Sequence, residues 1–181
     1  YGSSSAKTIT LSFHVRSSLT GTFGGALKNN ARNRNYPFTY TISSANTFEK
    51  KVITISGDTT GTWVGSTNGI GLWLSFGLGV GSNYSGSAGA WGAGDYFSAT
   101  GATSVVGTNG ATWYITGIQL EVGSQASDFQ HEDFGTTLAK CLRYYHRLDT
   151  STADYLGFSV GGAYGGTTAL TEFKPIVPMR I

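Results

Sequence analysis

Residues 113–145, WYITGIQLEVGSQASDFQHEDFGTTLAKCLRYY, mark the point where a long run of predicted strands ends and the one convincing helix begins. In the first ten residues apolar and polar side chains alternate with a period of two, the pattern of a half-buried β-strand. The apolar side chains predicted to share one face, opposite Gln119 and Glu121, are those of Tyr114, Ile118, Leu120 and Val122. A loop over residues 123–135 follows. The stretch therefore joins a finished β domain to a new element.

A short amphipathic helix is predicted from residue 136 onward, because the apolar residues change to a helical period. Its apolar stripe at i, i+3, i+4 and i+7 consists of Leu138, Cys141, Leu142 and Tyr145. Either Thr136 or Asp133 is available to cap the first turn. Because Cys141 lies on the stripe, we expect a small buried hydrophobe and not a nucleophile. A single cysteine also excludes an intrachain disulfide.

Upstream of this stretch, the sequence predicts short strands separated by turns. The clearest spans residues 7–16, and its inward side chains are those of Ile9, Leu11, Phe13 and Val15. Further strands are predicted over residues 22–28, 36–42, 48–56 and 70–80, and after the helix over 154–160, 165–171 and 172–179. Turn signals recur roughly every ten residues, which favours an all-β fold, an antiparallel β-sandwich or jelly roll.

The strand over residues 70–80 is predicted to be central in the sandwich, because one of its faces is apolar throughout. The glycines on its other face, Gly71, Gly77 and Gly79, leave a shallow trough in which Trp73 stands. A sugar-binding face is built in a similar way. We assign Trp63 and Trp113, which lie at strand ends, to the core.

The composition is typical of a β protein with tight turns and an uncharged polar surface. Charged residues make up 12% of the chain, and 27 of the 181 residues are glycine, against about 25% and about 7% in ordinary soluble domains. The net charge of +2 argues against a nucleic-acid surface. The one basic cluster, Lys28, Arg32 and Arg34, is interpreted as a solvated loop. No run approaches the roughly 20 apolar residues that span a bilayer.

The pattern within residues 113–145 resembles a segment found in many bacteriophage tail-fibre and receptor-binding proteins. The resemblance rests on ITGIQLEVGS, on the run RYY at residues 143–145, and on Ala126, Phe129, Gly135, Leu138 and Cys141. In that family the segment reads roughly ITGVQLEVG, then a loop, then a helix ending in CQRYY. The departures, such as Ser127 and Asp128 where the family has Thr-Pro, leave the apolar frame in place.

The resemblance implies two domains and a homotrimer. Residues 1–134 are expected to form a jelly-roll module similar to carbohydrate-binding modules, with its first strands lying before residue 1. Residues 135–181 are expected to form a linking helix and the start of a small C-terminal β domain, incomplete as given. The candidate oligomer contacts around a threefold axis are Leu138, Leu142 and Tyr145.

No catalytic constellation is found in the sequence. Asp128, Glu132 and Asp133 lie close together in a loop, whereas a glycosidase needs two carboxyls about 5 to 10 Å apart across a cleft. The histidines lack metal-ligand spacing, and no glycine-rich phosphate loop opens a helix. We therefore expect no enzyme and no cofactor. A structural calcium ion is common in the modules that the chain resembles. The carboxylate oxygens of Asp95, Asp128 and Glu121 are available as its ligands. No loop shows a dense pattern of calcium ligands, so we do not predict a calcium site.

An aromatic-rich, weakly charged β surface remains. Aromatic rings stack on the apolar faces of sugar rings, while polar side chains hydrogen-bond the hydroxyls. The candidate carbohydrate-binding residues combine both kinds and are Trp73, Asn83, Tyr84, Trp91, Asp95 and Tyr96. For each aromatic residue the alternative is packing in the core or in a trimer interface.

Together these features lead us to expect a component of a phage tail fibre in the virion, a non-enzymatic adhesin that binds a bacterial surface polysaccharide. As a homotrimer associated with other tail proteins it would act with avidity. No nucleic-acid partner and no membrane insertion are expected. One alternative is a structural virion protein, such as a fibre spacer or capsid decoration, without glycan binding. Another is a binding module of a polysaccharide-degrading enzyme.

Overall fold

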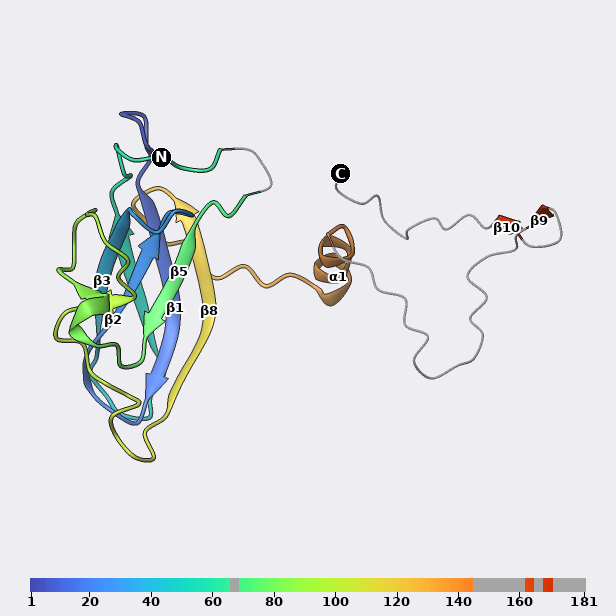
Figure 1. Cartoon of the computed structure of the whole chain (residues 1–181). Helices are drawn as coiled ribbons and strands as arrows, with labels where there is room; N and C mark the ends of the chain where they lie inside the picture. The colour runs from blue at the N-terminus through green and yellow to red at the C-terminus, as the bar shows by residue number, and fades with distance from the viewer. Residues whose placement is uncertain (66–68, 145–161, 165–167, 171–181) are drawn as a thin grey trace. The chain divides into compact units, whose positions relative to one another are not determined.

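The computed structural model describes residues 1–65, 69–144, 162–164 and 168–170. The protein is mostly β, with three small antiparallel sheets and one short α-helix, α1 (Phe134–Leu142) (Figure 1). The chain divides into two compact units, Tyr1–Phe129 and Gln130–Ile181. At this level the expected antiparallel β protein with one helix is confirmed. The expected domain boundary between residues 134 and 135 stays a prediction.

Two three-stranded antiparallel sheets form the first unit. One has the order β4-β1-β8, from β1 (Ile9–Ser17), β4 (Glu49–Ile55) and β8 (Trp113–Val122). The other has the order β3-β2-β5, from β2 (Gly21–Lys28), β3 (Asn35–Ile42) and β5 (Trp73–Gly77). A short 3-10 turn η1 (Ser82–Tyr84) precedes a parallel pair, β6 (Ser85–Gly86) and β7 (Ser98–Ala99). Figure 1 shows β8, in yellow, running along β1, in blue.

The hydrophobic core takes side chains from both sheets. On β1 the expected inward set Ile9, Leu11, Phe13 and Val15 is buried, as the alternation predicts. Thr10 and Ser12 are buried as well, because β1 is the middle strand and both of its edges are paired. The ring of Phe13 meets Tyr40 and Phe76 edge-on at 5.1 Å. Each such ring contributes about 1.5 to 3 kcal/mol through burial.

The strand β8 departs from the prediction in the direction of its side chains. Tyr114 pairs with Arg16 and Leu120 pairs with the buried Leu11, so these two apolar residues point to opposite faces. The register shifts between them, and Gly117 has a φ of 59°. Such a bulge adds one residue and reverses the alternation. The prediction that Tyr114 and Leu120 share a face is therefore wrong.

The strand β5 also differs, because it is a five-residue edge strand and not a central one. β2 is central in this sheet, although Gly24 and Gly25 interrupt its apolar pattern. Ile70 and Val80, expected on the apolar face of the longer strand, are exposed. The expected glycine trough is largely filled, since a Cβ on Gly77 would collide with Ser98 and one on Gly79 with Val106 and Ser104.

The helix α1 begins two residues earlier than expected and is capped by Asp133, one of the two predicted caps. The Asp133 carboxylate accepts hydrogen bonds from the Thr136 backbone N–H at 3.0 Å and from the Thr136 hydroxyl at 2.5 Å. The Thr136 hydrogen bonds lower the pKa of Asp133. Cys141 is exposed, so its expected burial is wrong. α1 has no buried residue in the described part of the chain.

The second unit also contains two short strands, β9 (Gly162–Tyr164) and β10 (Thr168–Leu170), which pair antiparallel. β10 falls inside the predicted strand over residues 165–171, and β9 was not predicted. The other predicted strands after the helix, and Tyr145, lie outside the described residues.

Candidate functional site

The outer face of the β3-β2-β5 sheet carries charged and aromatic side chains. On β2 the buried Leu27 packs in the core, so the next residue, Lys28, points to the outer face. Lys28 pairs with Trp73 on β5 across the antiparallel ladder. Because directly paired residues project to the same side of a sheet, Trp73 shares the outer face with Lys28.

Glycines let the following segment lie close on this outer face. Gly24 on β2 pairs with Gly77 on β5, and a Cβ at either position would collide with Ser98. The Ser75 hydroxyl has the carbonyls of Ala26 and Phe97 as acceptors at 3.2 and 3.3 Å, and the second of these contacts links the segment to the sheet. Gly77, one of the glycines predicted to leave a sugar-binding trough, thus serves the approach of the chain's own β7.

Asp95 and Lys28 form an ion pair on this face. The Lys28 Nζ lies 2.8 Å from Asp95 Oδ1 and 3.2 Å from the centre of the Phe97 ring. The Lys28 side chain is 2% exposed and that of Asp95 is 36% exposed. The counter-charge and the aromatic face both stabilise the buried ammonium. We call Lys28, Arg32, Asp95 and Phe97 the Asp95 cluster.

Arg32 reaches the same carboxylate from the loop between β2 and β3. Its Nη1 lies 3.6 Å from Asp95 Oδ2, and its side chain is 56% exposed. The loop is organised by the buried Asn29, whose Oδ1 accepts from the backbone N–H groups of Asn33 and Arg34, both at 3.1 Å. Arg32 itself has a positive φ of 57°, an uncommon conformation for a residue other than glycine.

Two exposed aromatic rings lie next to members of the Asp95 cluster. Trp73 is 42% exposed beside Lys28, and Tyr84 is 54% exposed with its ring 5.9 Å from that of Phe97. Asn83, next to Tyr84 in η1, is exposed as well. Stacking rings beside hydrogen-bonding charged groups are the combination that holds a sugar. Of the predicted sugar-binding residues, Trp73, Tyr84 and Asp95 are therefore each linked to a member of this cluster, and Asn83 is the sequence neighbour of Tyr84.

Tyr96 and Trp91 have packing roles in the structure. The Tyr96 ring fills the space above Gly86 and Gly94, where a Cβ on either glycine would clash with it. Trp91 packs against the core, and its Nε1 donates to the Ser56 carbonyl at 2.6 Å. Both rings are half-buried.

Trp91 belongs to a second aromatic group with Tyr1, Tyr36 and Trp63, which we call the Trp91 group. Its ring centres lie 4.9 to 5.8 Å apart. The expected core position of Trp63 is wrong, since Trp63 is half-buried in this group and outside the core. Trp113 does pack against the core, and its Nε1 donates to the Tyr40 hydroxyl at 3.1 Å. Burial raises the pKa of Tyr40.

Next to the Trp91 group, Arg34 and Asp58 form a bidentate ion pair. The Arg34 Nε and Nη2 donate to the two Asp58 oxygens at 2.7 and 2.6 Å, and the Asp58 side chain is 2% exposed. Burial by itself raises the pKa of Asp58. The hydrogen bonds from Arg34 and Thr60 outweigh burial, so its pKa is lowered. All of its strong partners are internal, which is typical of a structural ion pair.

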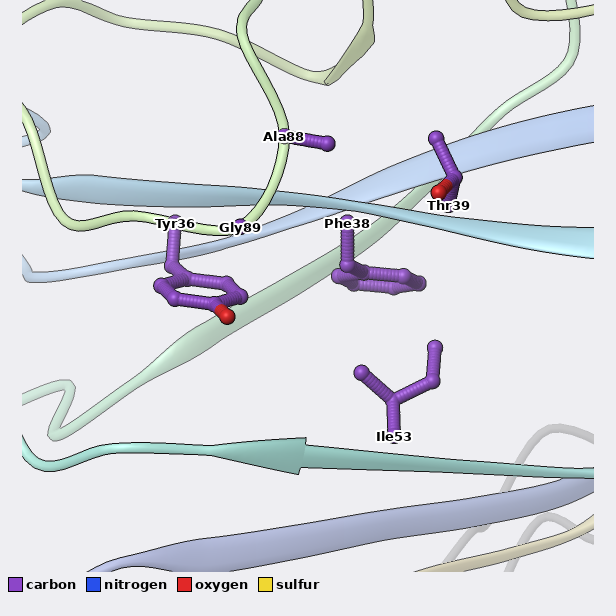
Figure 2. Close-up of a pocket in the computed structure, with 6 residues that line it drawn as sticks. All are labelled: Tyr36, Phe38, Thr39, Ile53, Ala88 and Gly89. Carbon is purple, nitrogen blue, oxygen red and sulfur yellow. The ribbon is translucent and has the colours of Figure 1, made fainter.

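A separate pocket of about 250 Å³ lies where β3 and β4 meet the loop over residues 87–90. Figure 2 shows the rings of Tyr36 and Phe38 pointing from β3 toward Ile53 on β4, with Ala88 and Gly89 on the loop. Thr39 completes the lining. The lining contains no charged side chain, so no ionic group of the lining is available to orient a ligand.

The acidic residues considered for calcium do not gather in one place. Asp95 pairs with Lys28, Glu121 accepts from the Ser127 hydroxyl and backbone, and Asp128 is fully exposed with Lys50 4.0 Å away. Within the residues that the structure describes, no three His, Cys, Asp or Glu side chains are placed to hold a metal ion. In the same part of the chain no helix is long and apolar enough to cross a membrane.

Sequence reasoning missed Lys28, Arg32 and Phe97 as members of the site. Lys28 and Arg32 were noticed only as part of a solvated basic loop. A signal was present in the position of Lys28, since it follows Leu27 on a strand that otherwise carries no charge. A charge there needs a partner, and Asp95 is 67 residues away in the sequence, so the partner itself could not be read from the sequence.

Comparisons with known proteins give no relative. No protein-family model, no curated protein and no solved structure matches the chain.

Proposed function

We propose that this protein is a non-enzymatic adhesin of a phage tail fibre that binds a bacterial surface polysaccharide through the outer face of the β3-β2-β5 sheet. The observation that carries the proposal is the placement of two exposed rings next to members of the Asp95 cluster, Trp73 paired with Lys28 and Tyr84 beside Phe97. The tail-fibre setting and a virion location rest on the resemblance of residues 113–145 to phage receptor-binding proteins.

The fold proposed for the first unit is a β-sandwich of the jelly-roll kind. Two antiparallel sheets that contribute side chains to one core support this architecture. In such an architecture an outer sheet face is free to carry a binding surface without disturbing the core. The Asp95 cluster lies on a face of that kind.

Binding of the purified protein to a panel of bacterial strains tests the proposal, before and after periodate oxidation of the surface sugars. We expect binding that oxidation abolishes. Trp73→Ala and Tyr84→Ala should each weaken binding about tenfold, because each removes a stacking ring worth roughly 1 to 1.5 kcal/mol. Tyr114→Ala is the matched control, since Tyr114 is 50% exposed on β8. Binding that survives oxidation contradicts the proposal.

A homotrimer is part of the proposal, with α1 as the candidate contact. Leu138 is exposed and Leu142 half-buried on the helix. An amphipathic helix without a buried face is suited to pack against its copies. Light scattering on the full chain should give three times the protomer mass, and Leu138→Asp should reduce it to one. A wild-type mass of one protomer contradicts this part.

A structural virion protein is the second candidate, favoured by the apolar edge of the first unit. Among the described strands β8 pairs only with β1, and it exposes Ile118, Leu120 and Val122, the last at 77%. Exposed apolar side chains along an unpaired strand edge are suited to contact another protein chain. This candidate predicts no polysaccharide binding by the purified protein and association only with other viral chains.

A further inference from the structure

We propose that the polysaccharide carries carboxylate groups, as in uronic acids, and that Arg32 binds one of them. This inference rests on the proposed glycan-binding function and names the class of sugar. Trp73 and Tyr84 supply stacking for any sugar, whereas Arg32 supplies a charge that only an acidic sugar uses.

The balance of charge in the Asp95 cluster favours an anionic ligand. Lys28 and Arg32 contribute two positive charges and Asp95 one negative charge, which leaves one positive charge in excess. The Lys28 ammonium is buried against Asp95 and Phe97. The uncompensated charge therefore lies on Arg32, on the solvent side.

The Arg32 guanidinium has unused hydrogen-bonding capacity. At 3.6 Å its Nη1 is beyond ordinary hydrogen-bond distance from Asp95 Oδ2, and it donates no hydrogen bond to another described residue. Guanidinium presents five N–H donors in a planar fork that matches a carboxylate. By contrast, Arg34 two residues later donates from two of its nitrogens, Nε and Nη2, to the two oxygens of Asp58.

The backbone holds Arg32 in a costly conformation next to Asp95. A positive φ at a residue with a long side chain is strained, and such strain is found where function fixes the conformation. Here the strain is stabilised by the backbone bond from Arg32 N to the Asn29 carbonyl at 3.1 Å and by the Asn29 side chain beneath. The loop is thus built in advance to present this guanidinium, which lowers the entropy lost on binding.

The test uses immobilised bacterial polysaccharides in three forms: uronate-containing polymers, the same polymers after chemical reduction of their carboxyl groups, and sulfated neutral polymers. We expect binding to the uronate polymers and a loss of about tenfold on carboxyl reduction. Arg32→Gln should weaken binding to the uronate polymers by the same factor and leave binding to the reduced polymers unchanged. Lys50→Gln, which removes a similar exposed ionic contact to Asp128, is the control and should bind as wild type.

The outcomes separate this inference from the function on which it rests. If the protein binds uronate and reduced polymers equally well and Trp73→Ala loses this binding, the carboxylate assignment is overturned. The adhesin function is then still supported. Sulfated polymers that bind as well as uronate polymers overturn it in favour of a general anion site. Absence of binding to every polysaccharide overturns both proposals. A thermal unfolding transition no lower than wild type shows that Arg32→Gln is folded.

Discussion

Asp58 and Asp95 each face an arginine from the same loop and lie near aromatic rings, but they differ in exposure and geometry. Asp58 is 2% exposed and is held by both nitrogens of the Arg34 fork. Asp95 is 36% exposed, bonds to the buried Lys28 and has Arg32 at 3.6 Å. The first carboxylate is saturated by internal partners, while the second leaves a guanidinium facing solvent.

The difference teaches that residue type alone does not identify a binding site. Both regions contain a tryptophan, a carboxylate and a guanidinium. In the Trp91 group the indole N–H donors of Trp63 and Trp91 are already bonded to backbone carbonyls. Around the Asp95 cluster the rings of Trp73 and Tyr84 are exposed. The site is marked by the ring surface and hydrogen-bonding groups that remain exposed after folding, and not by its residue composition.

The largest expected effect comes from the same substitution at the two arginines. Arg34→Gln should lower the free energy of unfolding by about 3 kcal/mol, because it leaves the buried Asp58 carboxylate without its partner. Arg32→Gln should change it by less than about 0.5 kcal/mol, because an exposed pair at long distance contributes little. Urea unfolding of the two variants measures this contrast. Equal losses of unfolding free energy in the two variants would contradict the proposed difference between the Asp58 and Asp95 ion pairs.

The Asp58 pair should also make the protein sensitive to acid. The pKa of Asp58 is lowered by folding, so the unfolded chain binds a proton at a higher pH than the folded protein does. The stabilisation is fully present above the ordinary pKa of 3.8 and is lost as the pH falls through the lowered value. Unfolding free energies of wild type and Arg34→Gln across this range should converge as the pH falls. A constant difference between them would contradict the assignment.

A smaller loss of stability is expected from Asp95→Ala. The Lys28 ammonium would stay buried with only the Phe97 ring beside it, at a cost of about 2 kcal/mol. The double variant Lys28→Met with Asp95→Ala should recover much of that loss, since no buried charge remains. A double-mutant cycle by urea unfolding measures the coupling. A double variant no more stable than Asp95→Ala would show that the buried ammonium is not the cause.

The smallest effect is a gain of stability at the strained loop. Arg32→Gly should raise the free energy of unfolding by about 0.5 to 1 kcal/mol, because glycine adopts a positive φ without steric cost. Asn46, with a φ of 58° in the turn between β3 and β4, is the control. Asn46→Gly should gain less, since asparagine tolerates this conformation better. Thermal unfolding of both variants decides whether Arg32 is strained.

Much of the strand pattern could be predicted because it follows from local alternation. Residues 7–16 predicted β1 and its buried face, and the cap at Asp133 was one of two possibilities read from the sequence. The faces of β8 were mispredicted because the alternation was taken as unbroken, whereas a bulge at Gly117 reverses it, and a glycine inside a strand is a known signal for a bulge. The helical period predicted burial of Cys141, but the period does not say what covers the stripe.

The site was predicted only in part, because its members come together through tertiary contacts. Trp73, Asn83, Tyr84 and Asp95 were chosen as residue types that bind sugars, and so were Trp91 and Tyr96, which pack elsewhere. The glycines around Trp73 suggested an open trough, whereas Gly77 accommodates Ser98 of β7. Which side chains keep exposed surface depends on such long-range packing.

Binding of the uronate polysaccharides to two tryptophan variants, one from each region, tests the central claim most directly. The account predicts that Trp73→Ala loses about tenfold in affinity, while Trp63→Ala, in the Trp91 group, binds as wild type when corrected for folded protein. Loss of affinity in Trp63→Ala with no loss in Trp73→Ala would place the binding surface at the Trp91 group and contradict the account.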